Sequence, residues 1–490
     1  MAETTIGLIG LAALFLLLAL RMPVAVAMIV VGVGGITVLN SWSAALSTLV
    51  RETFVLASFN ELSVIPLFVL MGNLATVSGM SRDLYDAAYA WVGRFRGGLA
   101  SATVVGCAGF AALSGSSVAS AVTMGRVSLP EMRRHNYDPR LATGAVAAGG
   151  TLGILIPPST GFVIYAVLTE ESIGRLFIAG VLPGLLLVSL FVVTIVLLTT
   201  WRPALGPARR GAAAPERYLS RRRLRASAVA ALAGAGLIAL SLAAAPALLV
   251  AALVLSLVAL LSAAISSAEQ LRALLRALPI VAIIVITLGG IYLGWFTPVE
   301  AAGVGAFLTM IVAAWRRALD LATVRQVLLQ SVGTTAMAFL ILIGAHIFSP
   351  FLALSQIPQE LGDALLGLEI GRHGVLAIIL AAYIVLGMFL EGFAMLVLTL
   401  PIVFPLIVEL GFDPIWFGVV VVIILEMGLI SPPVGINVFV VKSIAEDVPM
   451  RTIFAGILPF WLAMGICLVI LILFPAIATF LPNQMFQAVG

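Results

Sequence analysis

Two related stretches interrupt an otherwise apolar chain and decide its fold: Gly149-Gly150-Thr151-Leu152-Gly153-Ile154-Leu155-Ile156-Pro157-Pro158-Ser159 and Glu426-Met427-Gly428-Leu429-Ile430-Ser431-Pro432-Pro433-Val434-Gly435. Their Pro-Pro pairs begin at Pro157 and Pro432, which are 275 residues apart. Adjacent prolines remove two backbone donors and clash with the preceding helical turn, and the residue before each proline is pushed out of α geometry. We therefore predict two broken helices, unwound at 153–157 and at 428–432.

The composition of the surrounding chain is that of a membrane protein. Of its 490 residues, 62% are hydrophobic and 10% are charged, whereas soluble domains carry about 25% charged residues. Intrinsic disorder needs low hydrophobicity and high charge, so it is excluded as well. Backbone polar groups in lipid are satisfied only in helices and closed barrels, and the apolar runs here are long rather than alternating. The sequence predicts an all-α polytopic membrane protein.

The start of the chain and its cysteines narrow the class further. No basic segment precedes the apolar stretch 6–20, so we expect a permanent helix there rather than a removed signal. Cys107 and Cys467 both lie in apolar runs, which indicates neither a disulfide framework nor a metal cluster. The nucleotide-binding pattern Gly-x-x-x-x-Gly-Lys-Ser/Thr is absent from the sequence, so we expect an ion gradient to supply the energy and no cofactor to be needed.

The basic residues predict the topology. If 99–129 and 375–408 are re-entrant hairpins that enter and leave on one side, 23 of the 26 basic residues fall on the same face. Cytoplasmic loops are rich in Lys and Arg, so this arrangement predicts periplasmic termini and an arginine-rich cytoplasmic linker at 202–225. The net charge of +4 then marks a cytoplasmic rim, and we expect no nucleic-acid partner.

The two halves of the chain repeat each other weakly. At the same spacing of 275 residues, Asp138-Pro139 matches Asp413-Pro414 and Pro23-Val24 matches Pro298-Val299. We predict a first repeat at 1–200, a linker with two extra helices at 201–277, and a second repeat at 278–490. The arginine topology gives the repeats opposite orientations, and inverted repeats with paired broken segments are typical of transporters. A duplicated helical bundle with a structural role is the alternative.

Each half also carries a polar break at the tip of its hairpin. The first tip reads Leu113-Ser114-Gly115-Ser116-Ser117, and the second reads Phe389-Leu390-Glu391-Gly392-Phe393. Polar groups at mid-membrane are costly unless they pair or bind something. Helix ends at such a tip leave free carbonyls, which suit a hard cation such as Na⁺, and free N–H groups, which suit a carboxylate. Close helix packing through Ser and Gly is the alternative reading of the first tip.

In each half, the hairpin tip and the broken helix together define a candidate ion site. The two halves share a candidate anion site that lies between them. The first sodium site is predicted at Ser114, Gly115, Ser116, Ser117, Gly150, Thr151 and Gly153. The second sodium site is predicted at Glu391, Gly392, Met427, Gly428 and Ser431. The substrate site is predicted at Ser116, Pro157, Pro158, Ser159, Pro432, Pro433 and Asn437. We expect no catalytic residues and no metal beyond Na⁺.

The intramembrane acids are candidates for ion coupling. Glu391 either ligates Na⁺ or carries a proton, and the structural alternative is a neutral acid bonded to a neighbour; intramembrane acids favour the functional reading. Glu426 and Glu300 are weaker candidates that suit structural pairs. Asn73 and Glu61 fit either role.

At this point the sequence resembles the large membrane subunit of the TRAP (tripartite ATP-independent periplasmic) transporters. The matching segments cover both repeats: Ser114–Ala121, Gly149–Ser159, Ile65–Phe68, Phe177–Gly184 and Gly428–Asn437. The resemblance implies an ion-transporter-superfamily fold and Na⁺-driven import of a small organic anion, such as a C4-dicarboxylate, a sialic acid or a keto acid. It also implies two partners, a small four-helix membrane subunit and a periplasmic substrate-binding protein, with membrane lipid around the chain in a bacterial inner membrane.

The sequence departs from the family pattern in two places. The family joins its repeats by a short connector, whereas 202–277 adds an arginine-rich loop and apolar stretches at 226–244 and 247–266. Two helices are too few for the small subunit, so we expect that subunit as a separate chain. The family often has an aspartate at the second tip, where this chain has Glu391-Gly392.

The mechanism that follows is an elevator. A transport domain built from 80–168 and 353–445 slides along the scaffold formed by the other helices, and 81–96 and 353–371 lie as lateral arms near the membrane interfaces. Two rival functions are an intramembrane enzyme and an ion channel. The enzyme would need a catalytic pair that is not visible near the tips. The sequence leaves open the identity of the anion, the number of Na⁺ ions, the oligomeric state and the role of the extra helices.

Overall fold

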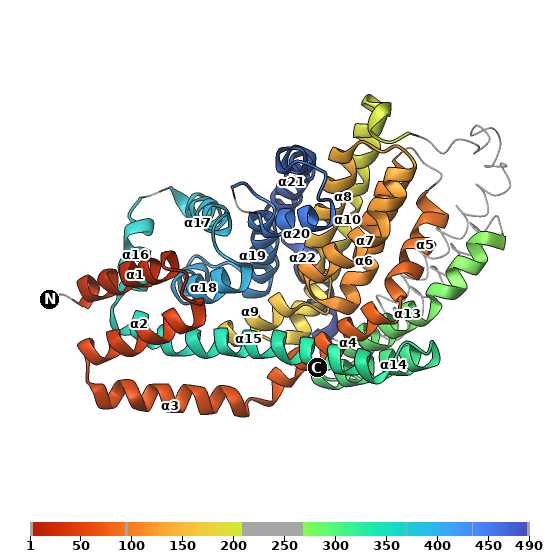
Figure 1. Ribbon diagram of the computed structural model, residues 1–490. Helices are drawn as coiled ribbons and strands as arrows, with labels where there is room; N and C mark the ends of the chain where they lie inside the picture. Colours follow the sequence, from red (N-terminus) through yellow and green to blue (C-terminus); the bar gives the residue numbers. More distant parts are fainter. Residues whose placement is uncertain (1–2, 94–96, 208–267, 369, 434, 488–490) are drawn as a thin grey trace.

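The computed structural model describes residues 3–93, 97–207, 268–368, 370–433 and 435–487 (Figure 1). The regular secondary structure of these residues is helical, with no strand among them. Eight of the described helices are long and apolar enough to cross a membrane. The predicted all-α polytopic membrane fold is confirmed. The two apolar stretches at 226–244 and 247–266 lie outside the described residues, as do Val434 and most of the arginine-rich linker.

The first half contains a helical hairpin followed by a broken helix. The hairpin is α6 (Gly98–Ser114) and α7 (Ser117–Arg134), and the broken helix is α8 (Pro139–Leu155) and α9 (Thr160–Thr169). The other elements are α1 (Glu3–Ala19), α2 (Val24–Leu39), α3 (Trp42–Ser58), the 3-10 turn η1 (Asn60–Ser63), α4 (Val64–Val77), α5 (Met80–Val92), α10 (Ile173–Trp201) and the 3-10 turn η2 (Pro203–Leu205).

The second half repeats this order of elements. Its hairpin is α17 (Gly371–Gly387) and α18 (Gly392–Glu409), and its broken helix is α19 (Pro414–Leu429) and α20 (Ile436–Ile444). The remaining helices are α13 (Ala268–Tyr292), α14 (Pro298–Trp315), α15 (Leu321–Leu354), α16 (Ile357–Leu366), α21 (Met450–Leu473) and α22 (Ala476–Gln487). Both predicted hairpins and both predicted broken helices are therefore present.

The Asp-Pro pairs explain where the broken helices begin. Asp138 and Asp413 are the N-cap residues of α8 and α19, and their carboxylates accept hydrogen bonds from the backbone N–H groups of Arg140 and Trp416. A proline follows each cap at the first helical position, where its missing N–H costs nothing. The peptide bonds Pro157-Pro158 and Pro432-Pro433 are both cis.

The unwound segments begin later in the chain than predicted. α8 continues to Leu155 and α19 to Leu429, so Gly153 and Gly428 are helical rather than unwound. The reason is local: a proline disfavours helical geometry in the residue directly before it, not in the four before it. Near the end of the chain, a break at Pro475 separates α21 from α22.

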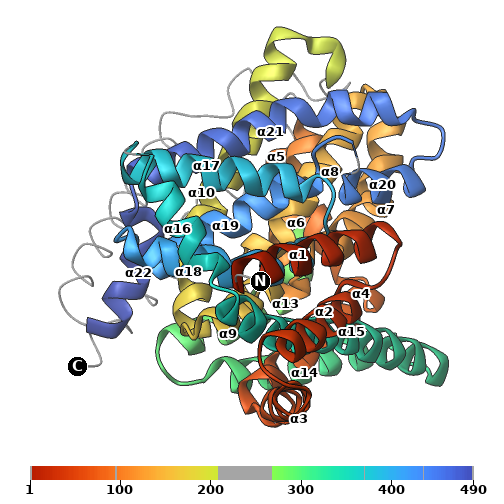
Figure 2. The same cartoon turned by 90° about the vertical axis from the view of Figure 1, so that its left-hand side faces the viewer.

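One helix was not expected at all. α3 lies at one edge of the molecule, where it contacts α2 and α15 (Figure 1). Polar residues such as Ser47, Arg51 and Glu52 interrupt its apolar sequence. The second half has the unbroken 34-residue α15 at the corresponding positions. The two repeats therefore differ most in their second segment. Figure 2 shows α3 and α21 on opposite sides of the molecule.

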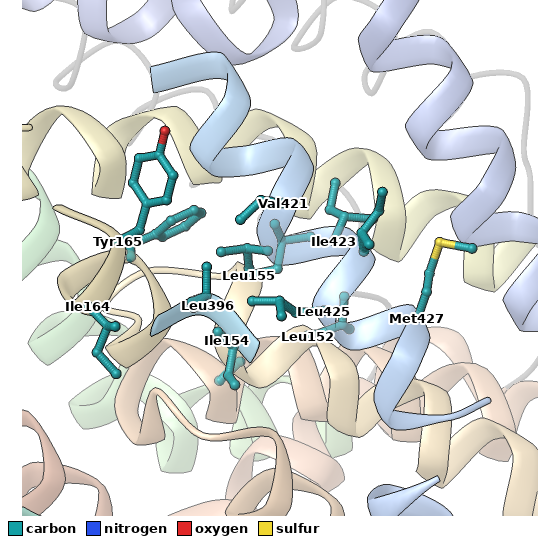
Figure 3. Close-up of a cluster of buried hydrophobic side chains, with 14 of the residues drawn as sticks. Leu152, Ile154, Leu155, Ile164, Tyr165, Leu396, Val421, Ile423, Leu425 and Met427 are labelled. Carbon is teal, nitrogen blue, oxygen red and sulfur yellow. The ribbon is translucent and has the colours of Figure 1, made fainter. Parts of the chain in front are cut away.

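The halves share one hydrophobic core around the broken helices. Leu152 and Leu155 of α8, Leu396 of α18 and Leu425 of α19 belong to the same buried cluster, drawn in Figure 3. Tyr165 of α9 crosses this core and donates a hydrogen bond of 2.7 Å to the carbonyl of Pro414. The core holds the breaks of both halves close together, which brings the predicted sites into one region.

Candidate functional site

The first hairpin turns at Gly115, as its sequence requires. Gly115 ends α6 with a φ of 57°, in the left-handed region where a β-carbon is strained. Ser116 then caps α7, because its hydroxyl accepts a hydrogen bond of 3.3 Å from the N–H of Ala119. Ser114 and Ser120 join their hydroxyl groups across the turn at 2.9 Å. The polar tip residues thus form a compact, internally bonded turn.

This first tip packs directly on the first broken helix. A methyl group at Gly153 would overlap the carbonyl of Ser116, and one at Gly115 would lie 2.8 Å from the carbonyl oxygen of Pro158. Thr160, the first residue of α9, donates a hydrogen bond of 2.8 Å to the carbonyl of Gly115. Glycines therefore allow backbone to meet backbone, and the structure brings together all residues of the predicted first sodium site.

Electrostatics at this contact favour a cation. α6 ends at Ser114 and α8 ends at Leu155, so the carbonyl ends of two helices converge beside the tip. The last carbonyls of a helix lack intrahelical partners and carry the negative end of its dipole. The hydroxyl of Thr151 donates to the carbonyl of Ala148 at 2.6 Å, which leaves its oxygen lone pairs as acceptors.

The second hairpin turns differently. Glu391 caps α18, and its carboxylate accepts a hydrogen bond of 3.1 Å from the N–H of Ala394. Glu391 follows Ser116 by 275 residues, so the two caps occupy equivalent positions in the repeats. The structure thus gives Glu391 a bond to a neighbour, and a cap of this kind is compatible with ion binding by its second oxygen.

The second tip meets its broken helix through glycines as well. A methyl group at Gly428 would lie 2.6 Å from the Cα of Gly387, so α19 and α17 touch backbone to backbone. Beyond the break, the hydroxyl of Ser431 donates to the carbonyl of Met427 at 2.6 Å and accepts a bond of 2.9 Å from the indole of Trp461. The predicted second-site residues therefore also lie together, although Met427 already uses its carbonyl.

The two Pro-Pro breaks differ in exposure. Pro157, Pro158 and Ser159 are buried, whereas Pro432 and Pro433 are exposed. Asn437, near the start of α20, is fully buried, and neither atom of its amide has a hydrogen-bond partner among the described residues. Buried polar groups are nearly always bonded. The amide of Asn437 is unpaired among the described residues, and its place in the substrate site stays a prediction.

A cavity of about 90 Å³ opens beside the first tip. Its polar lining comes from Asn73, Ser114, Ser116, Thr160 and Thr334, and Phe393 of the second tip closes one side. Three helices begin at this cavity, because Ser116 caps α7, Thr160 opens α9 and Phe393 is the second residue of α18.

The cavity contains residues that the sequence did not assign to the substrate. Asn73 is a lone amide in an apolar run, and its side chain donates to the hydroxyl of Ser331 at 2.9 Å. Thr160 and Thr334 gave no signal, since a threonine in an apolar helix usually bonds its own backbone. Of the residues predicted for the substrate, Ser116 alone lines this cavity. Within the described part of the chain, no cluster of three or more His, Cys, Asp or Glu side chains could hold a metal ion.

A family comparison decides what this architecture is. The family described as the "Tripartite ATP-independent periplasmic transporter, DctM component" matches residues 11–477. The chain belongs to this family. The resemblance found in the sequence is therefore confirmed, and the protein is the large membrane permease of a tripartite transport system. Its relatives are named as transporter permeases, not as enzymes, which removes the intramembrane enzyme as a rival.

Similar permeases carry several substrate names. The C4-dicarboxylate TRAP transporter large permease of Pseudomonas aeruginosa is 35% identical, over 92% of this chain and 93% of its own. The sialic acid TRAP transporter large permease of Vibrio cholerae is 29% identical over 88% and 87%. The ectoine TRAP transporter large permease of Halomonas elongata is 26% identical over 96% and 97%. The substrate named thus differs from one similar permease to the next.

A solved structure shares the fold of the permease. The Alcanivorax borkumensis YdaH transporter, whose structure was described as having an unusual topology, aligns with a TM-score of 0.55 at 14% identity. The alignment covers 91% of this chain and 89% of the YdaH chain. At this level of identity the likeness concerns the fold alone.

Proposed function

We propose that the permease imports a small organic anion together with Na⁺, and that the anion binds in the cavity beside the first tip. The observation that carries the proposal is the meeting of three helix N-termini at this cavity, those of α7, α9 and α18. Their free N–H groups and positive dipole ends favour an anion without any charged side chain. The carbonyl ends of α6 and α8 alongside favour the cation.

The anion is a carboxylate in this proposal, with a C4-dicarboxylate as the first choice. Three permeases that are 31–35% identical to this chain carry that substrate in their names. The uncharged lining, with Asn73 and hydroxyl groups, suits hydrogen bonding to carboxylate oxygens. We expect a periplasmic binding protein to deliver the anion and a small four-helix membrane subunit to complete the complex.

Na⁺ coupling is tested by uptake into proteoliposomes that contain the permease, its small subunit and its binding protein. The Ser116→Ala and Glu391→Gln variants should each raise the Na⁺ concentration needed for half-maximal uptake of labelled succinate. Ser189→Ala, an exposed serine of α10, and Glu409→Gln, at the exposed end of α18, are matched controls that should behave as the wild type. Normal Na⁺ dependence in both site variants contradicts the site assignment.

Exchange separates a carrier from a channel. Vesicles loaded with unlabelled succinate should accumulate labelled succinate by saturable counterflow, because a carrier returns its loaded site across the membrane. A channel conducts without such exchange, so conductance without counterflow would favour the rival function.

We propose an elevator in which the hairpins and broken helices move together past α4 and α15. Close contacts extend the moving body to α21, because a methyl group at Gly456 would overlap the carbonyl of Arg140 at the start of α8. α4 and α15 supply the opposite wall of the cavity through residues such as Val69 and Ala338. The proposed transport domain therefore includes α21 in addition to the segments 80–168 and 353–445.

Cross-linking across the cavity tests this movement. Val69 of α4 and Ala119 of α7 line the same cavity, and the native Cys107 and Cys467 are buried. A short cross-linker with two thiol-reactive maleimide groups, applied to the Val69→Cys/Ala119→Cys pair, should abolish uptake, while either single variant should keep it. Full uptake after complete cross-linking would contradict sliding at this face.

The orientation of the permease in the membrane is part of the same proposal. We place the permease in the bacterial inner membrane with both termini in the periplasm, because 23 of the 26 basic residues then face the cytoplasm. A reporter enzyme that is active only in the periplasm, fused after the last residue, should be active. Inactivity together with activity of a cytoplasmic reporter would reverse the orientation.

A further inference from the structure

One buried hydrogen bond joins the two halves of the permease. Ser117, the first residue of α7, donates its hydroxyl to Oε1 of Glu426 in α19, 309 residues away. Both side chains are 1% exposed. The bond links the first hairpin to the second broken helix inside the protein, where water cannot replace either partner.

The surroundings make this bond costly to lose. The second carboxyl oxygen of Glu426 has no hydrogen-bond partner among the described residues, and α19 around it is apolar from Val419 to Leu425. A buried polar group that loses its partner pays its whole desolvation cost, and hydrogen bonds strengthen in a low dielectric. Ser117 is thus the one side chain that bonds Glu426 within the described part of the chain.

Each partner of this hydrogen bond lies next to one of the two candidate ion sites. The carbonyl oxygen of Ser117 would lie 3.2 Å from a methyl group on Gly150, so Ser117 faces the first site with its backbone and Glu426 with its side chain. Glu426 directly precedes Met427 and Gly428, two residues of the second candidate site, and Gly428 touches Gly387 of α17. The bond therefore connects α7 at the first candidate site to α19 at the second.

We propose that the Ser117–Glu426 bond couples the two ion sites, with Glu426 as a positioning residue that makes their occupation cooperative. The inference rests on the proposed Na⁺ coupling. An ion that orders the first tip fixes Ser117, and the bond then holds α19 in the geometry that the second ion needs. Coupling of this kind is reciprocal, so each ion raises the affinity for the other by the same factor, typically about 5–150-fold.

The test measures binding of ²²Na⁺ to the purified full-length permease over a range of Na⁺ concentrations, at constant pH and constant ionic strength. The wild type should bind with a Hill coefficient clearly above 1. Ser117→Ala and Glu426→Ala should each lower the coefficient to about 1, and the double variant should fall no further, because both changes remove one interaction.

A conservative variant distinguishes positioning from general damage. Glu426→Gln keeps an oxygen that accepts from Ser117, so it should retain the cooperativity that Glu426→Ala loses. Glu409→Gln is the matched control on the exposed end of α18. If Glu426→Ala does not fold, Ser117→Ala and Glu426→Gln decide the question between them.

Two results overturn the coupling. One is a wild-type Hill coefficient in Ser117→Ala or in Glu426→Ala, and the other is loss of cooperativity in Glu426→Gln. If the wild type binds Na⁺ saturably with a Hill coefficient of about 1, the coupling between the sites is overturned and the proposed function is not. Absence of Na⁺ binding in the wild type overturns the proposed function with it.

Discussion

The two hairpin tips occupy equivalent places in the repeats, yet they are built from different chemistry. The first tip has three serines and a left-handed glycine, and it is enclosed by α4 and the buried break at Pro157. The second tip has a glutamate cap between large apolar residues, with Phe389 65% exposed. The first tip closes a site by backbone contact, whereas the second leaves its break open.

Two tips with the same backbone plan therefore need not offer the same ligands. Capping at Ser116 and at Glu391 starts α7 and α18 in the same way, since a hydroxyl and a carboxylate both accept from a backbone N–H. The carboxylate adds a charge that a hydroxyl lacks. Substitutions at matched positions of the two halves test how far the tips are equivalent.

The close glycine contacts of both halves should be destabilised to the same extent by an added methyl group. Gly153→Ala and Gly428→Ala each push a methyl group into backbone atoms that have no freedom to move aside. Overpacking of this kind costs about 1–3 kcal/mol, so both variants should unfold at clearly lower temperatures and lose uptake. Gly465→Ala in α21, where a methyl group meets nothing within 4 Å, is the control. Tolerance of one site variant and not the other would separate the halves at their closest contact.

The turn glycines should respond differently. Gly115→Ala forces a side chain into left-handed geometry, which costs about 1–2 kcal/mol, and brings it within 2.8 Å of the carbonyl of Pro158. Gly392→Ala lies in the first turn of α18 with its nearest contact at 3.7 Å, so it should be neutral or slightly stabilising. Thermal unfolding of both variants measures the contrast. Equal losses would mean that the second tip is as tightly closed as the first.

The cap residues should differ in stability. Ser116→Ala removes the acceptor for Ala119 and should cost about 1 kcal/mol. Glu391→Gln keeps an acceptor for Ala394, so unfolding should change less. A glutamine that preserves stability but weakens Na⁺ dependence assigns the charge of Glu391 to the ion. Unchanged Na⁺ dependence would leave Glu391 as a cap.

The smallest effect is expected at the base of the first hairpin. Arg133 at the end of α7 pairs with Asp447 at 2.6 Å, and this donated hydrogen bond holds the pKa of Asp447 below its usual range. A lowered carboxyl pKa stabilises the fold above the ordinary Asp value, and the contribution is lost as the pH falls through the lowered value. Because both partners are exposed, Asp447→Asn should leave unfolding at neutral pH almost unchanged. A large loss at neutral pH would show that the first hairpin is anchored at its base.

The sequence predicted the hairpins and breaks because backbone chemistry alone fixes them. Gly115 permits the turn, Asp138 and Asp413 start the broken helices, and the Pro-Pro pairs end them. The predicted extent of unwinding was wrong because a proline disfavours helical geometry only in the residue directly before it, so Gly153 and Gly428 stay helical. α3 was missed because one face of this helix is polar, so its sequence is not a continuous apolar segment.

The cavity and the bond between the halves were beyond the reach of the sequence. The partner of Glu426 is 309 residues away, and no pattern within α19 identifies Ser117. Thr334 and Asn73 join the cavity only because α15 and α4 pack against the first tip. Such sites depend on tertiary contacts between residues far apart in the chain.

The central claim is that a Na⁺ gradient drives anion uptake through the paired tips. The most direct measurement compares uptake of labelled succinate by the reconstituted complex under an inward Na⁺ gradient and under an equal K⁺ gradient, at zero membrane potential. The account predicts accumulation above the external concentration with Na⁺ and none with K⁺. Equal accumulation with both ions would contradict it.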